Sequence, residues 1–189
     1  RMIKYAILGY GTVGSGVAEV LSMNAASIAS RVGEPVEVKY ILDLRDFPDS
    51  PYADRLVKDF SIIENDPEVS VVAECIGGAR VARDFTLRAL KAGKSVVTSN
   101  KALVAAKGAE LLAIAKAHDC NYLFEASVGG GIPIIDPLKH SLIANKITQV
   151  MGIVNGTTNY MLTRMDEAGL SYDEALKEAQ ANGFAEADP

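Results

Sequence analysis

The chain has 189 residues, enough for one ordinary domain and part of a second. With 49% hydrophobic residues and a formal net charge of −5, its composition excludes a disordered chain and predicts a sizeable core. The slight acidity without a basic cluster argues against nucleic acid as a partner, and no apolar run reaches the roughly 18 residues of a membrane helix.

Strands and helices are predicted to alternate along the first two thirds of the chain. Apolar residues 2–8 predict a strand, which runs into a glycine turn and then a helix that extends through residue 28. Further strands are predicted at residues 36–42, 69–76, 95–98 and 121–125, and helices at residues 80–92 and 102–118, the latter interrupted near Gly108. Alternation of this kind predicts a doubly wound (Rossmann-type) α/β fold with a parallel sheet. Only residues 43–60 remain as a long loop.

The pattern changes near Pro133, where we expect a domain boundary. Residues 1–133 would form the nucleotide-binding domain and residues 134–189 a second domain. In the second part, a short helix is expected at Pro137, a strand at residues 146–154 and a helix at residues 157–168. Ser171 and Glu174 form a capping-box pattern, which predicts that a last helix begins there and ends at Gly183.

The two cysteines, Cys75 and Cys120, are too few for a disulfide framework and lie among apolar residues. They predict packing roles in a reducing, cytoplasmic setting. The first strand begins directly, without a charged leader and apolar segment before it.

A glycine-rich turn follows the first predicted strand. Gly9, Gly11 and Gly14 leave the backbone free of side chains where N–H groups and a helix N-terminus can meet a dinucleotide pyrophosphate. Because the pattern lies directly between a strand and a helix, it predicts dinucleotide binding. A plain turn between strand and helix is the alternative.

Two charged residues follow the second predicted strand. Asp43 is placed to accept hydrogen bonds from a ribose, although it comes later than the roughly 20-residue spacing typical of this fold. Arg45 is close enough in sequence to meet a 2′-phosphate instead. The choice between NAD and NADP stays open, and both residues are equally well explained as solvated loop charges.

The residues after the next two strands are candidates because ligands of open α/β sheets bind beyond the carboxyl ends of the strands. Gly77 and Gly78 let the backbone approach a flat ring or a ribose, or form an ordinary turn before a helix. Lys101 begins a helix, where the dipole disfavours a cation, so contact with an anion is one interpretation and a surface lysine the other.

Three later segments carry polar groups. Residues 125–133 join the carboxylate of Glu125 to a turn with three glycines. Such all-oxygen sets suit hard cations, but the residues alone favour a hinge between domains. Residues 155–159 are either an elaborate helix N-cap or a small-anion site. Residues 184–189 contain two carboxylates, a pattern typical of a solvated tail.

Together these segments resemble the homoserine dehydrogenase family over essentially the whole chain. The resemblance rests on residues 9–14, 76–78 and 98–101, and on three more specific stretches at residues 125–133, 152–160 and 184–189. Members of this family reversibly reduce L-aspartate 4-semialdehyde to L-homoserine with NAD(P)H, on the route to threonine, methionine and isoleucine. The resemblance therefore implies NADP or NAD as cofactor, a small-molecule substrate and, for a full-length member, a homodimer.

The resemblance also implies roles for individual residues. Lys101 would lie at the nicotinamide and substrate end of the cofactor as a catalytic-site residue, and Glu186 would bind the amino group of the substrate. The implied cofactor contacts are Gly9, Gly11, Thr12, Val13, Gly14, Ile76, Gly77 and Lys101. The implied substrate contacts are Gly156, Thr157, Phe184 and Glu186. The implied ligands of a monovalent cation, sodium in the family, are the side chain of Glu125 and the carbonyl groups of Val128, Gly130 and Ile132. For this segment the cation site replaces the hinge as the preferred interpretation.

In the family, the acidic motif near the end of this sequence is followed by an aspartate and by the lysine that usually donates the proton. This sequence ends at Pro189, so we expect a fragment with an incomplete α+β substrate and dimerisation domain, some cofactor binding and little dehydrogenase activity. Two alternatives remain, a nucleotide-binding module without catalysis and another Rossmann-type semialdehyde or imine reductase. A reductase of the aspartate-semialdehyde type needs an activated cysteine, for which neither cysteine is well placed.

Overall fold

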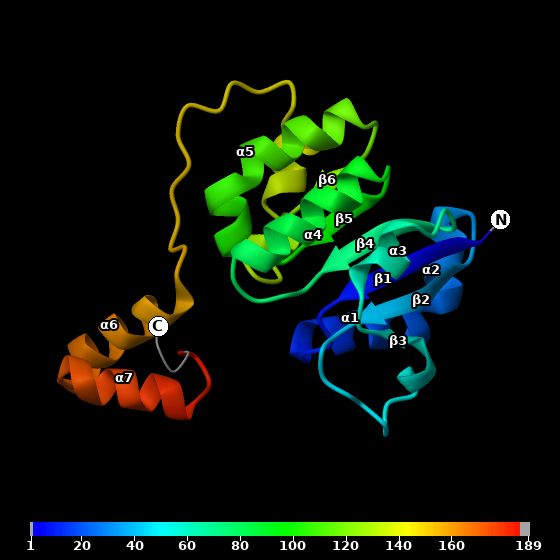
Figure 1. Cartoon of the computed structure of the whole chain (residues 1–189). Coiled ribbons are helices and arrows are strands. Elements are labelled where there is room, and N and C mark those ends of the chain that lie inside the picture. The colour runs from blue at the N-terminus through cyan, green and yellow to red at the C-terminus, as the bar shows by residue number, and fades with distance from the viewer. Residues whose placement is uncertain (1, 186–189) are drawn as a thin grey trace. The chain divides into compact units, whose positions relative to one another are not determined.

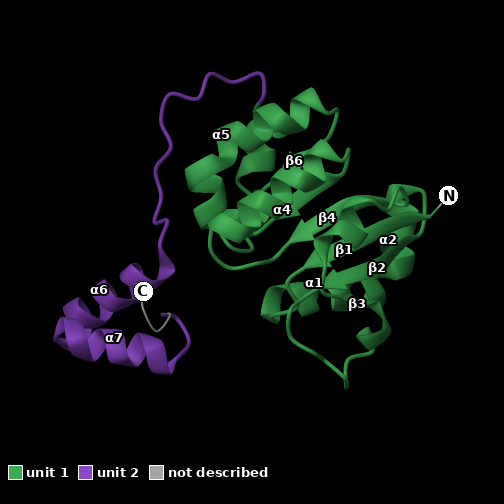
Figure 2. Ribbon diagram, in the orientation of Figure 1, with its two compact units in different colours: residues 1–142 green, residues 143–189 purple. Residues whose placement is uncertain are grey.

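The computed structural model describes residues 2–185, which divide into two compact units. Unit 1 is Arg1–Leu142 and unit 2 is Ile143–Pro189 (Figure 2). Each unit has a hydrophobic core of its own and is described by itself. Among the described residues, no helix has the length and apolar character needed to cross a membrane.

Unit 1 is built on a six-stranded parallel sheet with the strand order β3-β2-β1-β4-β5-β6 (Figure 1). The strands are β1 (Ile3–Leu8), β2 (Val36–Leu42), β3 (Leu56–Val57), β4 (Val69–Glu74), β5 (Ser95–Thr98) and β6 (Tyr122–Leu123). The order reverses between β1 and β4, so the connections that follow these two adjacent strands run to opposite sides. The prediction of a doubly wound parallel sheet is therefore confirmed.

Helices cover both faces of this sheet. They are α1 (Thr12–Met23), α2 (Ala25–Val32), α3 (Phe60–Glu64), α4 (Arg80–Lys91) and α5 (Lys101–Ala117), with short helical turns η1 (Ala53–Arg55), η2 (Glu125–Ser127) and η3 (Pro137–Ser141). Successive strand residues point to opposite faces, so Ala6 and Leu8 join one core and Ile7 joins the other. The first core packs against α3, α4 and α5, and the second packs against α1.

Three expectations for unit 1 are wrong in detail. The expected loop at residues 43–60 contains η1 and β3, because a strand of only two residues shows no alternation in sequence. The single helix expected through residue 28 is two helices, since the backbone at Asn24 leaves the helical conformation (φ −105°, ψ 18°). The interruption expected near Gly108 is absent, and α5 is continuous through all of its described residues. A glycine costs a helix only about 1 kcal/mol, which the burial of Leu103 and Leu111 offsets.

Unit 2 contains two helices, α6 (Gly156–Ala168) and α7 (Tyr172–Ala181), among its described residues. Met161 packs against Ala175 and Ala179 between them. The capping box is confirmed: the Ser171 hydroxyl accepts a hydrogen bond from the Glu174 N–H, and the Glu174 carboxylate accepts one from the Ser171 N–H at 2.9 Å.

The strand expected at residues 146–154 is wrong. All of these residues are described, and none of them lies in a strand. The segment is exposed, with Val154 at 96%. A strand needs a neighbour to satisfy its backbone groups, and the described residues of unit 2 include no other strand. The segment is rich in β-branched residues, which favour a strand only where a partner strand is present.

Candidate functional site

The three glycines after β1 differ in what surrounds them. Gly9 has a φ of +90°, and a Cβ there would lie 2.9 Å from the carbonyl oxygen of Cys75. A Cβ at Gly14 would lie 1.9 Å from the carbonyl oxygen of Gly9, whereas one at Gly11 would find its nearest neighbour, the Arg45 side chain, 4.0 Å away. Gly9 and Gly14 therefore allow close packing of turn, strand and helix, and Gly11 leaves room for a ligand to approach the backbone.

The first turn of α1 begins at this open glycine. Gly11 is the N-cap and offers no side chain to the helix end. The first intrahelical bond of this turn runs from the Ser15 N–H to the Gly11 carbonyl at 2.9 Å, so the N–H groups of Thr12, Val13 and Gly14 have no acceptor one turn earlier. Together with the helix dipole, such N–H groups bind phosphate.

Asp43 connects the end of β2 to the glycine turn. Its Oδ2 accepts a hydrogen bond from the Tyr10 N–H at 2.8 Å, and its Oδ1 accepts one from the Arg45 N–H at 2.9 Å. The Arg45 guanidinium also donates to both oxygens. The guanidinium first, and then the backbone N–H groups, hold the pKa of Asp43 well below its ordinary value. The carboxylate is thus ionised and already hydrogen-bonded, with its side chain only 8% exposed.

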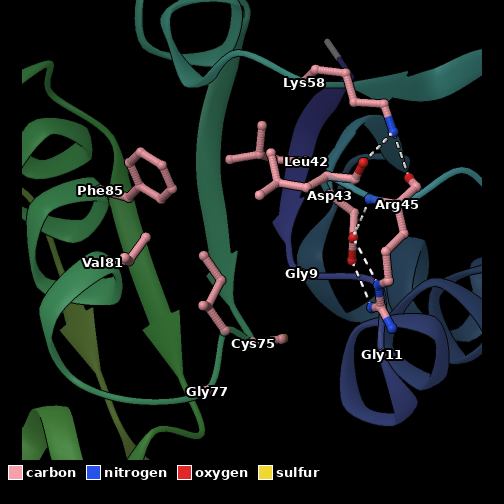
Figure 3. A pocket seen from close by; sticks show the side chains of 12 residues that line it. Gly9, Gly11, Leu42, Asp43, Arg45, Lys58, Cys75, Gly77, Val81 and Phe85 are labelled. Carbon is pink, nitrogen blue, oxygen red and sulfur yellow. Dashed lines mark hydrogen bonds and ion pairs between the residues drawn. The ribbon is translucent and has the colours of Figure 1, made fainter.

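A cavity of about 540 Å³ lies beside the turn. In Figure 3, Asp43, Arg45 and Lys58 lie on one side of it and the apolar side chains of Val81 and Phe85 on the other. The remaining lining residues are Gly9, Gly11, Leu42, Leu44, Cys75, Ile76 and Gly77. An apolar wall opposite a polar one suits a ligand with a flat ring and charged groups.

The charged wall carries two cations. Lys58 Nζ donates to the carbonyl oxygens of Leu44 and Arg45 at 3.1 and 2.5 Å, and pairs with an Asp46 carboxylate oxygen at 2.8 Å. The Arg45 side chain is 63% exposed. The exposed Arg45 guanidinium is therefore accessible to an anion, whereas the three donors of Lys58 are already engaged and only its charge lies near the cavity.

Lys101 is the first residue of α5 and is exposed. Asn100 caps the helix, because its Oδ1 accepts a hydrogen bond from the Leu103 N–H at 3.0 Å. Lys101 therefore stands at the carboxyl end of β5, outside the lining of the cavity.

Glu125 binds the chain segment that follows it. Its Oε1 accepts hydrogen bonds from the N–H groups of Ile134 and Ile135 at 2.5 and 3.0 Å, and its Oε2 accepts one from Asp136 at 2.6 Å. These bonds, that of Ile134 first, lower the pKa of Glu125. A carboxylate accepts about four hydrogen bonds, so one acceptor direction remains for a cation.

The residues that follow Glu125 form a sharp turn. Gly129 and Gly130 have φ values of +70° and +60°, conformations that turn the chain sharply. Within the described part of the chain, no three His, Cys, Asp or Glu side chains cluster as metal ligands. Any cation here would therefore depend on one carboxylate and backbone carbonyls, a donor set for a hard ion.

Unit 2 contains the residues expected to contact substrate. The Thr157 hydroxyl donates a hydrogen bond to the carbonyl oxygen of Phe184, and the Phe184 ring lies edge-on to Tyr160 with centroids 5.0 Å apart. Gly156 is the first residue of α6. The structure thus brings Thr157 and Phe184 together, while Glu186 lies outside the described residues.

Residues 155–159 contain a helix N-cap, one of the two interpretations open from sequence. The Asn155 side chain accepts a hydrogen bond from the Thr158 N–H at 3.0 Å.

Four of the expected cofactor residues line the cavity, namely Gly9, Gly11, Ile76 and Gly77. Thr12, Val13 and Gly14 form the first turn of α1 beside it. The lining residues that the sequence did not single out are Leu42, Leu44, Lys58, Val81 and Phe85. Two of them could have been found from the sequence. Val81 and Phe85 are apolar, lie four residues apart just after the glycines at 77 and 78, and so share one face of the helix that follows.

Comparison with known proteins gives the family. A family model described as "Homoserine dehydrogenase, NAD binding domain" matches residues 9–125, and one described as "Homoserine dehydrogenase" matches residues 133–189. The homoserine dehydrogenases of Bacillus subtilis and Corynebacterium glutamicum are 45% and 46% identical to this chain. These alignments cover 100% and 99% of the chain but only 44% and 42% of the relatives, so the chain spans less than half the length of the curated relatives it matches.

Solved structures give the same result. A homoserine dehydrogenase from Thiobacillus denitrificans matches with a TM-score of 0.91 and 42% identity, over 100% of this chain and 44% of the other. A hyperthermophilic archaeal homoserine dehydrogenase in complex with NADPH matches with a TM-score of 0.83 and 27% identity, over 100% of this chain and 64% of the other. Because a family model covers more than half of it, this chain belongs to the homoserine dehydrogenase family.

Proposed function

We propose that the chain supplies the nicotinamide-nucleotide part and the beginning of the substrate part of an enzyme that interconverts L-homoserine and L-aspartate 4-semialdehyde. Residues 1–133 bind the cofactor, and residues 134–189 begin a substrate-binding and dimerisation domain. The observation that carries the proposal is the glycine turn, where Gly9 and Gly14 pack tightly and Gly11 is open beside the cavity. The two family matches, which stop at residue 125 and start at residue 133, support the boundary.

The chemistry divides between the two parts. A bound reduced nicotinamide supplies the hydride that converts the aldehyde carbon to an alcohol, and the substrate oxygen gains one proton. Lys101 begins α5 at the carboxyl end of β5, and in this proposal its ammonium group meets the nicotinamide end of the cofactor and the substrate. Gly156, Thr157 and Phe184 line the substrate pocket, and Glu186 binds the substrate's amino group.

The charged wall favours NADP over NAD. In an NAD site, an acidic residue after the second strand accepts hydrogen bonds from the ribose. Here the Asp43 carboxylate is almost fully covered and is engaged by Arg45. Arg45 instead offers guanidinium N–H groups for charge-assisted hydrogen bonds to a 2′-phosphate, and Lys58 adds positive charge beside it.

Glu125 and the carbonyl groups of Val128, Gly130 and Ile132 hold a monovalent cation such as sodium in this proposal. The remaining acceptor direction of the carboxylate and the all-oxygen donor set support it. Family membership supports a cytoplasmic homodimer that acts in threonine, methionine and isoleucine biosynthesis. We propose no nucleic-acid or membrane partner.

Fluorescence titration with NADPH and NADH tests cofactor binding. The chain has no tryptophan, so the emission of the reduced nicotinamide is measured against a low protein background. We expect saturable binding of both, with a Kd for NADPH about tenfold lower, as one charge-assisted contact provides. A chain that binds neither ligand contradicts the proposed function.

The substrate role is tested in a protein that includes a whole catalytic domain. Glu186→Gln should raise the KM for homoserine and leave the affinity for NADPH nearly unchanged, because the carboxylate contacts only the substrate's amino group. Unchanged homoserine kinetics would remove Glu186 from the site, whereas a protein that binds NADPH and does not turn over homoserine at all would favour a nucleotide-binding module without catalysis.

A further inference from the structure

Three buried polar side chains join the carboxyl ends of β4 and β5. Glu74 is the last residue of β4 and is in register with Thr98, the last residue of β5. Glu74 is 0% exposed, and Thr98 and Asn100 are also buried. A carboxyl group is rarely buried to this extent unless it is paired or hydrogen-bonded. The proposed function gives this cluster no role.

Glu74 is hydrogen-bonded on both oxygens. Its Oε1 accepts from the Ile76 N–H at 2.7 Å, and its Oε2 accepts from the Thr98 hydroxyl at 2.6 Å. The same hydroxyl accepts from the Asn100 N–H at 2.9 Å. Burial raises the pKa of Glu74, while the hydrogen bonds from Thr98, Ile76 and Asn100 act in the opposite direction. Glu74 therefore fixes the backbone at Ile76 and the direction of the Thr98 hydroxyl together.

Asn100 connects this cluster to the loop at residues 76–78. Its Nδ2 donates to the carbonyl oxygens of Ile76 and Gly78 at 3.0 and 2.6 Å, while its Oδ1 caps α5. Ile76 and Gly77 line the cavity, and Lys101 directly follows Asn100. One continuous set of hydrogen bonds thus holds both a wall of the cavity and the start of α5.

We infer that Glu74 is a positioning residue for the nicotinamide half of the cofactor, acting through Thr98 and Asn100 on residues 76–78 and on the start of α5. This inference rests on the proposed function. Dinucleotide folds consist of two mononucleotide-binding halves that meet where the strand order reverses. The cluster joins β4 to β5 in one half, whereas Asp43, Arg45 and Lys58 follow β2 and β3 in the other. Loss of the cluster therefore weakens contacts to the nicotinamide half more than those to the adenosine half, which the opposite wall with Arg45 and Lys58 also holds.

Glu74→Gln in the 189-residue chain tests this separation with two probes, NADPH and 2′,5′-ADP, which lacks the nicotinamide half. Glutamine can still accept from the Ile76 N–H, but its amide group faces the Thr98 hydroxyl with a donor, so that hydrogen bond is lost or reversed and the hydroxyl proton loses its acceptor. We expect the Kd for NADPH to rise about tenfold and that for 2′,5′-ADP to change less than about twofold, as one lost hydrogen bond predicts.

Threonine variants keep the test valid if Glu74→Gln fails to fold. Thr98→Val removes the hydroxyl and should reproduce the loss of NADPH affinity, whereas Thr98→Ser keeps the hydroxyl and should retain that affinity. Thr86→Val is the matched control, since Thr86 is buried in α4 and its hydroxyl has no hydrogen-bond partner among the described residues. It should change neither Kd.

Two results overturn the inference. One is an unchanged Kd for NADPH in both Glu74→Gln and Thr98→Val. The other is an equal loss of affinity for NADPH and 2′,5′-ADP, which a merely structural role would produce. If the unaltered chain binds neither probe, the proposed function fails, and the inference fails with it.

Discussion

The Arg45 guanidinium pairs with the Asp43 carboxylate through two hydrogen bonds, Nε to Oδ1 at 3.0 Å and Nη2 to Oδ2 at 2.9 Å. Asp43, which could accept hydrogen bonds from a ribose, is thereby already hydrogen-bonded to Arg45, two positions later in the sequence. In the proposed function, cofactor preference therefore depends on the pair rather than on either residue alone.

Arg45→Gln should shift the preference from NADPH towards NADH. The substitution removes a cation from the charged wall and releases the Asp43 carboxylate for ribose hydroxyl groups. We expect the Kd for NADPH to rise by about tenfold or more and that for NADH to fall, because a hydrogen bond to a charged group contributes about 1.5–3 kcal/mol. Arg31→Gln, in the last turn of α2, is the control in the fluorescence titration. Parallel changes in both affinities would contradict this role.

Alanine at Gly14 and at Gly16 should have opposite effects on stability. At Gly14 a Cβ would overlap the Gly9 carbonyl oxygen, so α1 must shift, at a cost typical of overpacking, about 1–3 kcal/mol. At Gly16 a Cβ meets nothing within 4 Å, and alanine should stabilise α1 by up to about 1 kcal/mol. Urea unfolding measures both, and NADPH binding should be lost only in Gly14→Ala. Equal effects at both positions would argue against the packing at the turn.

The contribution of Asp43 to stability should disappear in acid. The pKa of Asp43 is lowered in the folded chain, chiefly by Arg45, relative to about 3.9 in an unfolded one. A lowered pKa stabilises the fold above the unfolded value, and this stabilisation is lost as the pH falls below it. The difference in unfolding free energy between the unaltered chain and Asp43→Asn should therefore be largest at neutral pH and shrink below about pH 4. Asp54→Asn, an exposed change in η1, is the control.

The two cysteines should differ in reactivity. Burial, with a smaller effect from the neighbouring Glu74 charge, raises the pKa of Cys75 to about 12. Burial and then the charge of Asp119 raise the pKa of Cys120 less far. Since the thiolate is the reactive form, iodoacetamide should label Cys120 first and Cys75 mainly after unfolding. Peptide mass spectrometry distinguishes the two sites, and NADPH should slow labelling of Cys75 further because Cys75 lines the cavity. Faster labelling of Cys75 than of Cys120 in the folded chain would contradict the higher pKa of Cys75.

The main strands and the glycine turn were predictable because their signals are local. Buried parallel strands are continuous apolar runs, and a turn between strand and helix leaves a glycine pattern. β3 was not predicted because a strand of two residues is too short to show alternation of apolar and polar residues. Residues 146–154 were wrongly predicted as a strand because β-propensity does not show whether a partner strand is present. The cavity-lining role of Lys58, Val81 and Phe85 was not predicted for another reason. Their segments are far apart in sequence, and only the order of strands in the sheet brings them to one cavity.

The packing around Gly9 also limits how this sequence can evolve. A Cβ at Gly9 would meet the Cys75 carbonyl oxygen, and a Cβ at Gly14 would meet the carbonyl oxygen of Gly9 itself. Both obstacles are backbone atoms, which are present whatever side chain those residues carry. A substitution at another position cannot remove these backbone atoms. The side chains around the turn can therefore change during evolution while positions 9 and 14 remain glycine.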